Sequence, residues 1–197
     1  MSTFPENPGQ SDSVRDALRR SRLVAREAMT EEEHHLASTL IEEALFQHLA
    51  NRVPGLLAFC WPIRREFDPL PLLARLCGLG WRACMPVVVA PNAPMAFHEW
   101  SPQAAMKPGY YDIPVPVVAT PVHPDLVLLP LVAFDSHCYR LGYGGGYFDR
   151  TLAALTPQPI TIGIGFELAR VDSISPETHD VALDYVVTEA GIFACPD

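Results

Sequence analysis

The chain has 197 residues, of which 49% are hydrophobic and 19% charged, and this length and composition predict one globular domain rather than two independent ones. The formal net charge of −9 argues against a general surface for nucleic acid or anionic membranes, because both would need a basic face. The polar first residues contain no apolar stretch after a basic start, so neither a signal peptide nor a transmembrane segment is expected.

These features predict a cytoplasmic protein with a disordered tail over residues 1–13 and a single domain over residues 14–197. The cysteines are odd in number and lack CxxC spacing, which predicts reduced and mostly buried thiols in a reducing compartment. They are Cys60, Cys77, Cys84, Cys138 and Cys195.

Two helices are predicted at the start of the domain. Small and apolar residues recur at helical spacing from Val14 to Met29, and Thr30 with Glu33 forms a capping box for a second helix that runs to about Ala50. The other side of the first helix carries Arg15, Arg19, Arg22 and Arg26. For a helix standing alone a solvated face is the favoured interpretation, yet arginine is also the main basic side chain that this chain offers to an anion.

After residue 50 the sequence predicts alternating strands and helices, which together indicate an α/β fold with helices on both sides of the sheet, because the strands are apolar on both faces. Six prolines in residues 101–124 predict a long loop there. The predicted strands are residues 55–61, 83–89, 97–100, 125–134, 160–166 and 184–189, and the predicted helices are residues 68–80 and 147–155.

A glycine-rich segment lies between the most hydrophobic predicted strand and the helix that begins near Tyr147. Its glycines are Gly142, Gly144, Gly145 and Gly146. In this arrangement backbone amides and a helix N-terminus cradle phosphate, and Arg140 and Arg150 flank the segment. It has neither the spacing of a Walker loop nor that of a dinucleotide fold. A tight turn whose glycines only permit packing is the alternative interpretation.

The run from residue 126 to residue 153, LVLLPLVAFDSHCYRLGYGGGYFDRTLA, resembles the signature of the 5-formyltetrahydrofolate cyclo-ligases, also called methenyltetrahydrofolate synthetases. The segments FCWPIRREFD, FHEW, YDIPVP and HDVALDYVVTE resemble further landmarks of that family, so the similarity covers about residues 14–190. The resemblance implies a three-layer αβα fold with a mostly parallel sheet. It also implies ATP- and Mg²⁺-dependent conversion of 5-formyltetrahydrofolate to 5,10-methenyltetrahydrofolate, with release of ADP and phosphate and without a protein nucleophile.

The resemblance further implies a set of site residues. Those matched to ATP are Arg15, Arg19, Arg140, Leu141, Gly142, Tyr143, Gly144, Gly145, Gly146, Tyr147 and Phe148. Those matched to the folate are Trp61, Glu66, Tyr143, Gly144, Gly145, Gly146 and Tyr147, and the two matched to magnesium are Asp149 and Asp184. The chain departs from the family pattern in three ways: Arg15 replaces a common lysine, Phe148 replaces a common tyrosine, and the pair Arg64 and Arg65 replaces small residues before Glu66.

The expected partners are small molecules, namely reduced folate and ATP, with no nucleic acid and no membrane, and the chain is expected to be a monomer or a weak homodimer. One alternative is a non-catalytic relative that binds reduced folate or nucleotide, and another is an RNA- or phosphoprotein-binding module that uses the arginine helix. The histidines lack transition-metal spacing. Loop 101–124 is predicted to close over the folate, and Phe97, Trp100, Tyr110 and Tyr111 are interpreted as packing residues rather than as stacking partners of the pterin.

Overall fold

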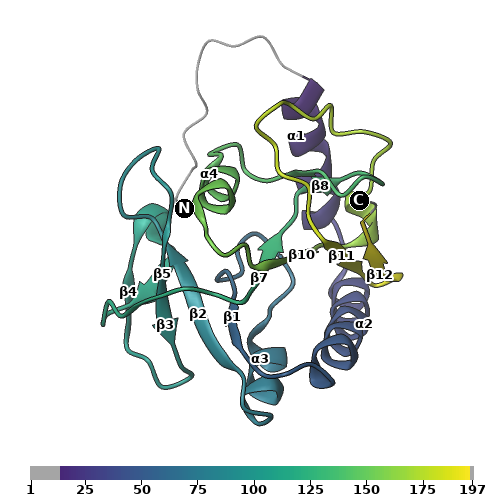
Figure 1. Cartoon of the computed structure of the whole chain (residues 1–197). Coiled ribbons are helices and arrows are strands. Elements are labelled where there is room, and N and C mark those ends of the chain that lie inside the picture. The colour runs from purple at the N-terminus through teal and green to yellow at the C-terminus, as the bar shows by residue number, and fades with distance from the viewer. Residues whose placement is uncertain (1–13, 196–197) are drawn as a thin grey trace.

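The computed structural model describes residues 14–195, so the predicted tail over residues 1–13 lies outside the described residues. An eight-stranded sheet has the order β12-β11-β10-β7-β1-β2-β3-β6 (Figure 1). Its centre is parallel from β11 to β2, whereas β12 at one side and β3 and β6 at the other pair antiparallel. The predicted α/β class with a mostly parallel sheet is confirmed.

The helices are α1 (Val14–Glu27), α2 (Glu31–Ala50), α3 (Leu70–Cys77) and α4 (Tyr147–Ala154), with 3-10 helices η1 (Tyr110–Asp112) and η2 (Glu167–Ala169). The sheet strands are β1 (Leu56–Ala58), β2 (Arg82–Val87), β3 (Ala96–Trp100), β6 (Pro121–Val122), β7 (Leu126–Pro130), β10 (Ile160–Ile164), β11 (Tyr185–Thr188) and β12 (Gly191–Ala194). Two small hairpins consist of β4 (Met106–Pro108) with β5 (Pro114–Pro116) and of β8 (Ala133–Phe134) with β9 (Arg140–Leu141).

The sheet is covered on both faces, as the apolar strands predict. Leu57 of β1 and Leu128 of β7 face α2 and α3, whereas Ala58 and Leu129, the next residues along each strand, share a second core with Leu152 of α4. Alternate residues of one strand point to opposite faces, so both faces need apolar side chains. The result is a three-layer arrangement, with α1 lying against η2 and β8.

The capping box predicted at the second helix is present. The Thr30 hydroxyl accepts a hydrogen bond from the Glu33 amide at 3.2 Å, and Glu33 Oε2 accepts one from the Thr30 amide at 2.8 Å. Each contact satisfies a backbone donor that the helix itself leaves unpaired. The short link between α1 and α2 is therefore fixed by local chemistry.

Two strand predictions and one loop prediction were wrong in detail. Residues 125–134 form two strands, because Pro130 has no N–H for the ladder and the chain turns away to begin β8. The predicted loop 101–124 contains the β4–β5 hairpin and β6, which prolines keep short. The strand at 184–189 is not the last, because the chain turns at Gly191, with φ of 129°, and adds β12.

The cysteine prediction was also wrong in part. Cys138 and Cys195 form a disulfide with a Cα–Cα distance of 5.8 Å, and Cys60, Cys77 and Cys84 are free thiols. The two bonded cysteines are 57 positions apart, so spacing in the sequence gave no signal of the pair. The bond ties the residue after β12 to the turn between β8 and β9. Among residues 14–195, no helix is long and apolar enough to cross a membrane.

Candidate active site

The glycine-rich loop, residues 142–146, joins β9 to the N-terminus of α4. The chain reaches it from the carboxyl end of β7 by way of the β8–β9 hairpin, rather than straight from one strand. Ligands of open α/β sheets bind outside the carboxyl ends of the parallel strands. The loop therefore begins from the edge of the sheet where a binding site is expected.

The amides of this loop are available to a ligand. Gly144 and Gly145 are exposed, and the backbone N–H groups of Gly144, Gly145 and Gly146 donate to no other residue of the described chain. Gly144 has φ of 94° and Gly146 has φ of 61°, a region that side chains disfavour. Free amides at a helix N-terminus fit an anion better than a turn that only packs.

Two arginines hold the carbonyl groups of the loop. Arg19 Nε donates to the Gly142 carbonyl at 3.1 Å, and Arg150 Nη2 donates to the Gly145 carbonyl at 2.6 Å. The Arg19 guanidinium also lies against Gly144, 3.7 Å from where a Cβ of that residue would be. Both cations are therefore beside the free amides, where they can add charge-assisted bonds to a bound phosphate.

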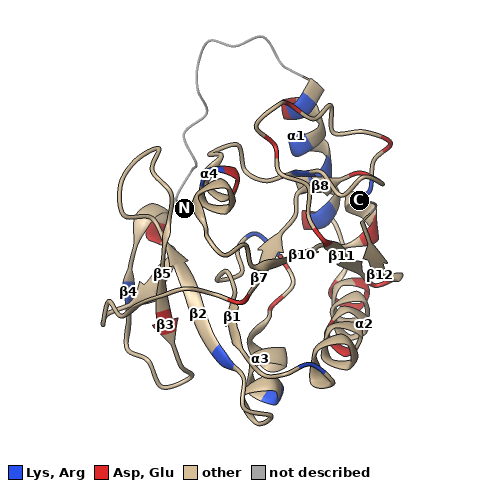
Figure 2. Cartoon of the chain, in the orientation of Figure 1, with Lys and Arg blue, Asp and Glu red and all other residues tan. Residues whose placement is uncertain are grey.

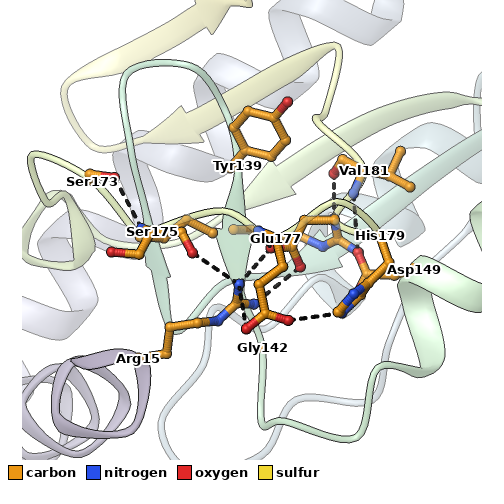
Figure 3. Close-up of polar contacts among 12 residues, drawn as sticks. Arg15, Tyr139, Gly142, Asp149, Ser173, Ser175, Glu177, His179 and Val181 are labelled. Carbon is orange, nitrogen blue, oxygen red and sulfur yellow. Dashed lines mark hydrogen bonds and ion pairs between the residues drawn. The ribbon is translucent and has the colours of Figure 1, made fainter. Parts of the chain in front are cut away.

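The arginine stripe of α1 does not form a solvated face, so that interpretation was wrong. Figure 2 shows the basic residues of α1 beside acidic residues of neighbouring segments. Arg15 donates to Asp180 at 2.6 and 3.1 Å and to the Ser175 carbonyl at 3.2 Å (Figure 3). Arg22 donates to the Leu168 carbonyl at 3.0 Å. The stripe thus fastens α1 to the segments that surround the glycine-rich loop.

Asp149, in the first turn of α4, is hydrogen-bonded through only one of its two carboxylate oxygens within the described residues. Its Oδ1 accepts from Arg140 Nη2 at 3.0 Å and from the Val181 amide at 3.4 Å, and Arg140 Nη1 donates to the Val181 carbonyl at 2.8 Å (Figure 3). Burial lowers the pKa of Arg140, and the Asp149 carboxylate partly offsets that effect. Asp149 Oδ2 receives no hydrogen bond within residues 14–195, so one carboxylate oxygen stays open to a cation.

Asp184 is engaged elsewhere. Its Oδ2 accepts from the Thr161 amide and from the Thr161 hydroxyl, both at 2.7 Å, at the amino ends of β10 and β11. In the part of the chain that the structure describes, no group of three or more Asp, Glu, His or Cys side chains could hold a metal ion. Mg²⁺ needs only one or two carboxylates plus phosphate oxygens. Asp149 fits that need, whereas the geometry gives Asp184 a role in strand pairing.

Glu66 lies in the turn after β1 and is only 7% exposed. Its Oε1 accepts from the Tyr143 hydroxyl at 2.6 Å and its Oε2 accepts from the Ile63 amide at 2.9 Å, while Arg26 Nη2 lies 3.9 Å from Oε1. Burial raises the pKa of Glu66, and the Tyr143 hydrogen bond and the Arg26 charge partly offset that rise. A buried carboxylate with a raised pKa is typical of a functional site.

A small pocket of about 20 Å³ opens beside Glu66. It is lined by Phe59, Cys60, Glu66, Phe67, Pro69, Leu128, Pro130 and Ile164, so it lies at the carboxyl ends of β1, β7 and β10. That volume suits about one water molecule. Trp61 is half-buried against the larger core and is not part of the lining. A pterin ring could enter only after neighbouring side chains move.

Arg64 and Arg65 face away from this pocket. Arg64 Nε donates to Glu27 at 2.8 Å, and Arg65 forms an ion pair with Glu31 and donates to the Met29 carbonyl at 3.0 Å. Both residues have positive φ, of 47° and 58°. Their charges anchor the turn to the link between α1 and α2, so this departure from the family pattern adds no charged side chain to the lining of the pocket.

The aromatic residues divide into two groups. Phe97 and Trp100 are buried in the cores, as expected for packing residues. Tyr110, between β4 and β5, lies with its ring centroid 6.3 Å from that of Tyr147 at the start of α4. Residues 101–124 thus reach the first residue of α4, directly after the glycine-rich loop. Arg26 is the residue that sequence reasoning missed as part of the site, although its place in the arginine stripe was a signal.

Comparison with known proteins decides the family. A family model described as the 5-formyltetrahydrofolate cyclo-ligase family matches residues 11–189. The chain belongs to this family. A 5-formyltetrahydrofolate cyclo-ligase from Mycolicibacterium smegmatis is 32% identical over 95% of this chain and 98% of its own length. The cyclo-ligase of Escherichia coli K12 is 32% identical over 65% of this chain and 74% of its own length.

Solved structures of the family agree with the fold. The 5,10-methenyltetrahydrofolate synthetase from Mycoplasma pneumoniae superposes with a TM-score of 0.75 at 26% identity, covering 90% of this chain and 99% of that one. The synthetase from Aquifex aeolicus gives a TM-score of 0.76 at 25% identity, covering 94% of each chain. The resemblance found in the sequence is therefore confirmed at the level of family and fold.

Proposed function

We propose that this chain is a 5-formyltetrahydrofolate cyclo-ligase, which converts 5-formyltetrahydrofolate to 5,10-methenyltetrahydrofolate and uses ATP as co-substrate. The observation that carries the proposal is the adjacency of two unlike sites. Exposed loop amides suited to phosphate lie within one residue of Tyr143, whose hydroxyl is 2.6 Å from the buried carboxylate of Glu66. An enzyme that transfers a phosphoryl group from ATP to a folate needs these two sites side by side.

In the proposed reaction the formyl oxygen attacks the γ-phosphorus of ATP and ADP leaves. The 10-nitrogen then attacks the activated formyl carbon, and the ring closes as the proton of that nitrogen and the phosphate depart. No side chain forms a bond to the substrate, so catalysis rests on positioning and on neutralising phosphate charge. The loop amides with Arg19 and Arg150 hold the phosphates, and Glu66 accepts the paired N–H groups of the pterin.

Arg15 would contact the phosphates only after it exchanges part of its ion pair with Asp180. Bound Mg²⁺ would neutralise phosphate oxygens, and Asp149, through its open oxygen, is the residue proposed to hold it. We retain Asp184 as a proposed magnesium-associated residue only through the family resemblance. The remaining positions of the loop, from Arg140 to Phe148, and Trp61 are proposed contacts of ATP and folate on the same basis.

We further propose that residues 14–197 act as one domain, that the protein works in the cytoplasm as a monomer or weak homodimer, and that it binds neither nucleic acid nor membranes. A non-catalytic folate binder is not favoured, because Arg64 and Arg65, which prompted that alternative, are paired with Glu27 and Glu31 outside the pocket.

The test is absorbance of the methenyl product after purified protein is mixed with 5-formyltetrahydrofolate, Mg²⁺ and ATP. We expect a rise that requires ATP and that stops when the metal is chelated. If the protein binds folate but the absorbance does not rise under these conditions, the protein is a non-catalytic relative and the proposed function is wrong.

A further inference from the structure

Arg26 is a buried cation at the meeting point of three segments. It is 4% exposed, and its guanidinium donates to the Arg64 carbonyl at 3.0 Å, to the Leu131 carbonyl at 3.1 Å and to the Tyr143 hydroxyl at 2.7 Å. A charge buried this deeply is costly unless every donor is paired. Arg26 therefore has a defined geometry that fixes the position of the Tyr143 hydroxyl.

Tyr143 continues this chain of hydrogen bonds to Glu66. Its hydroxyl accepts from Arg26 and donates to Glu66 Oε1 at 2.6 Å, so α1, the glycine-rich loop and the turn after β1 are joined through three side chains. Tyr143 stands between Gly142 and Gly144. A change in the backbone of the loop would therefore move the Tyr143 hydroxyl.

In the observed state Tyr143 is hydrogen-bonded to one of the two Glu66 oxygens that a pterin would need. One oxygen of Glu66 accepts from Tyr143 and the other from the Ile63 amide, and the adjoining pocket of about 20 Å³ has room only for about a water molecule. A ligand with two adjacent N–H donors would bind best to a carboxylate whose oxygens both face it. Tyr143 and such a ligand compete for Glu66.

We propose that Arg26 and Tyr143 are positioning residues that couple the two ligand sites, with Tyr143 blocking Glu66 until phosphate groups bind the loop. Binding of phosphate to the loop amides repositions Tyr143 and releases Glu66 for the folate. Arg26, whose Nη2 lies 3.9 Å from Glu66 Oε1 in the observed state, compensates the charge of Glu66. The inference rests on the proposed function, because it takes the loop as the nucleotide site and Glu66 as the folate site.

Calorimetric titration of the full chain with 5-formyltetrahydrofolate, with and without a non-hydrolysable ATP analogue, tests the coupling. In the wild type we expect the analogue to tighten folate binding by about fivefold or more, since coupling between sites commonly has at least that size. In Tyr143→Phe we expect tighter folate binding without the analogue and a ratio near one. Tyr185→Phe, which changes a tyrosine on β11 away from the loop, is the matched control and should keep the wild-type ratio.

A wild-type ratio of one would overturn the inference whatever the variant does, and so would a wild-type ratio that persists in Tyr143→Phe. Folding of the variant is checked by circular dichroism. If the wild type binds no folate at all, the proposed function itself fails. If it binds both ligands and turns over but shows no coupling, the function stands and only the role of Tyr143 is wrong.

Discussion

The turn that carries Glu66 and the glycine-rich loop are neighbours with opposite construction. Around Glu66 the carboxylate oxygens are paired, Arg64 and Arg65 are fastened to Glu27 and Glu31, and the pocket is nearly filled. In the loop the carbonyls are paired with Arg19 and Arg150, whereas the glycine amides have no partner in the described chain. We therefore infer that the pocket beside Glu66 must open before it binds a ligand, whereas the glycine-rich loop can bind an anion as it stands.

The largest effect is expected from removing the negative charge of Glu66. Glu66→Gln should lower kcat/KM for the folate by about 100-fold or more, because hydrogen bonds to a charged group contribute roughly 1.5–3 kcal/mol each. The methenyl absorbance assay measures it. The affinity for ATP should stay close to that of the wild type, and a variant that loses ATP binding as well would break the distinction between the two sites.

Variants of Asp149 and Asp184 distinguish a role in metal binding from a role in strand pairing. Asp149→Asn should lower turnover by about tenfold or more and raise the Mg²⁺ concentration needed for half-maximal rate, because it weakens the proposed carboxylate ligand. Asp184→Asn should instead lower the free energy of unfolding by about 1–3 kcal/mol, because two donors of Thr161 lose their ionised acceptor. The reverse pattern, in magnesium titrations and urea unfolding, would assign the metal to Asp184.

Gly144→Ala should weaken the glycine-rich loop as an ATP site more than it weakens the folate site. A side chain at φ of 94° costs about 1–2 kcal/mol, so KM for ATP should rise about tenfold while folate binding persists. Gly191→Ala is the matched control, because Gly191 also has positive φ, of 129°, but lies in the turn before β12. If both variants raised KM for ATP equally, the effect would come from general destabilisation.

Lower pH should weaken folate binding before it weakens ATP binding. Burial raises the pKa of Glu66, with Arg26, Arg64 and Tyr143 acting against the rise, and the Cys60 thiol lies in the same pocket. The folate affinity should therefore begin to fall above the usual glutamate pKa of about 4.3.

The stability of the protein should depend on pH in the opposite direction. A carboxyl group that binds its proton more tightly when folded makes the protein less stable as pH rises from the ordinary pKa to the raised one. The free energies of unfolding of the wild type and of Glu66→Gln, measured in urea, should thus diverge over that interval. The wild type should become less stable relative to the variant as pH rises. Parallel curves would mean that Glu66 has an ordinary pKa.

The smallest effect on activity is expected from the disulfide, which holds the hairpin that leads into the loop. Cys195→Ser should lower the free energy of unfolding by about 2–4 kcal/mol in the absence of reductant, while turnover is largely kept. Thiol titration of the denatured, unreduced wild type should detect Cys60, Cys77 and Cys84 alone. Reactivity of all the cysteines would show that the bond is absent in solution.

What the sequence could predict was set by local chemistry. The capping box of Thr30 and Glu33 and the helical spacing of α1 depend on neighbouring residues, and both were predicted. The partner of Arg15 is Asp180, 165 positions away, and no pattern in the chain links them. The solvated interpretation of the arginine stripe failed for that reason.

The site was predictable in composition but not in arrangement. The glycines and Glu66 followed from motif and resemblance, whereas the contact of Tyr143 with Glu66 spans 77 positions and depends on how the β8–β9 hairpin returns the chain. The split of residues 125–134 at Pro130 produces that hairpin. The sequence places Arg26 in the arginine stripe of α1 but does not show that it is buried. Its burial between Tyr143 and the turn that carries Glu66 is what connects the two sites.

The central claim is that Glu66 and the glycine-rich loop serve different ligands of one reaction, and calorimetry on Glu66→Gln and Gly144→Ala tests it most directly. Each variant is titrated separately with 5-formyltetrahydrofolate and with a non-hydrolysable ATP analogue. We expect Glu66→Gln to lose the folate and keep the nucleotide, and Gly144→Ala to bind the nucleotide about tenfold more weakly and keep the folate. Loss of the same ligand in both variants, or of neither, would contradict it.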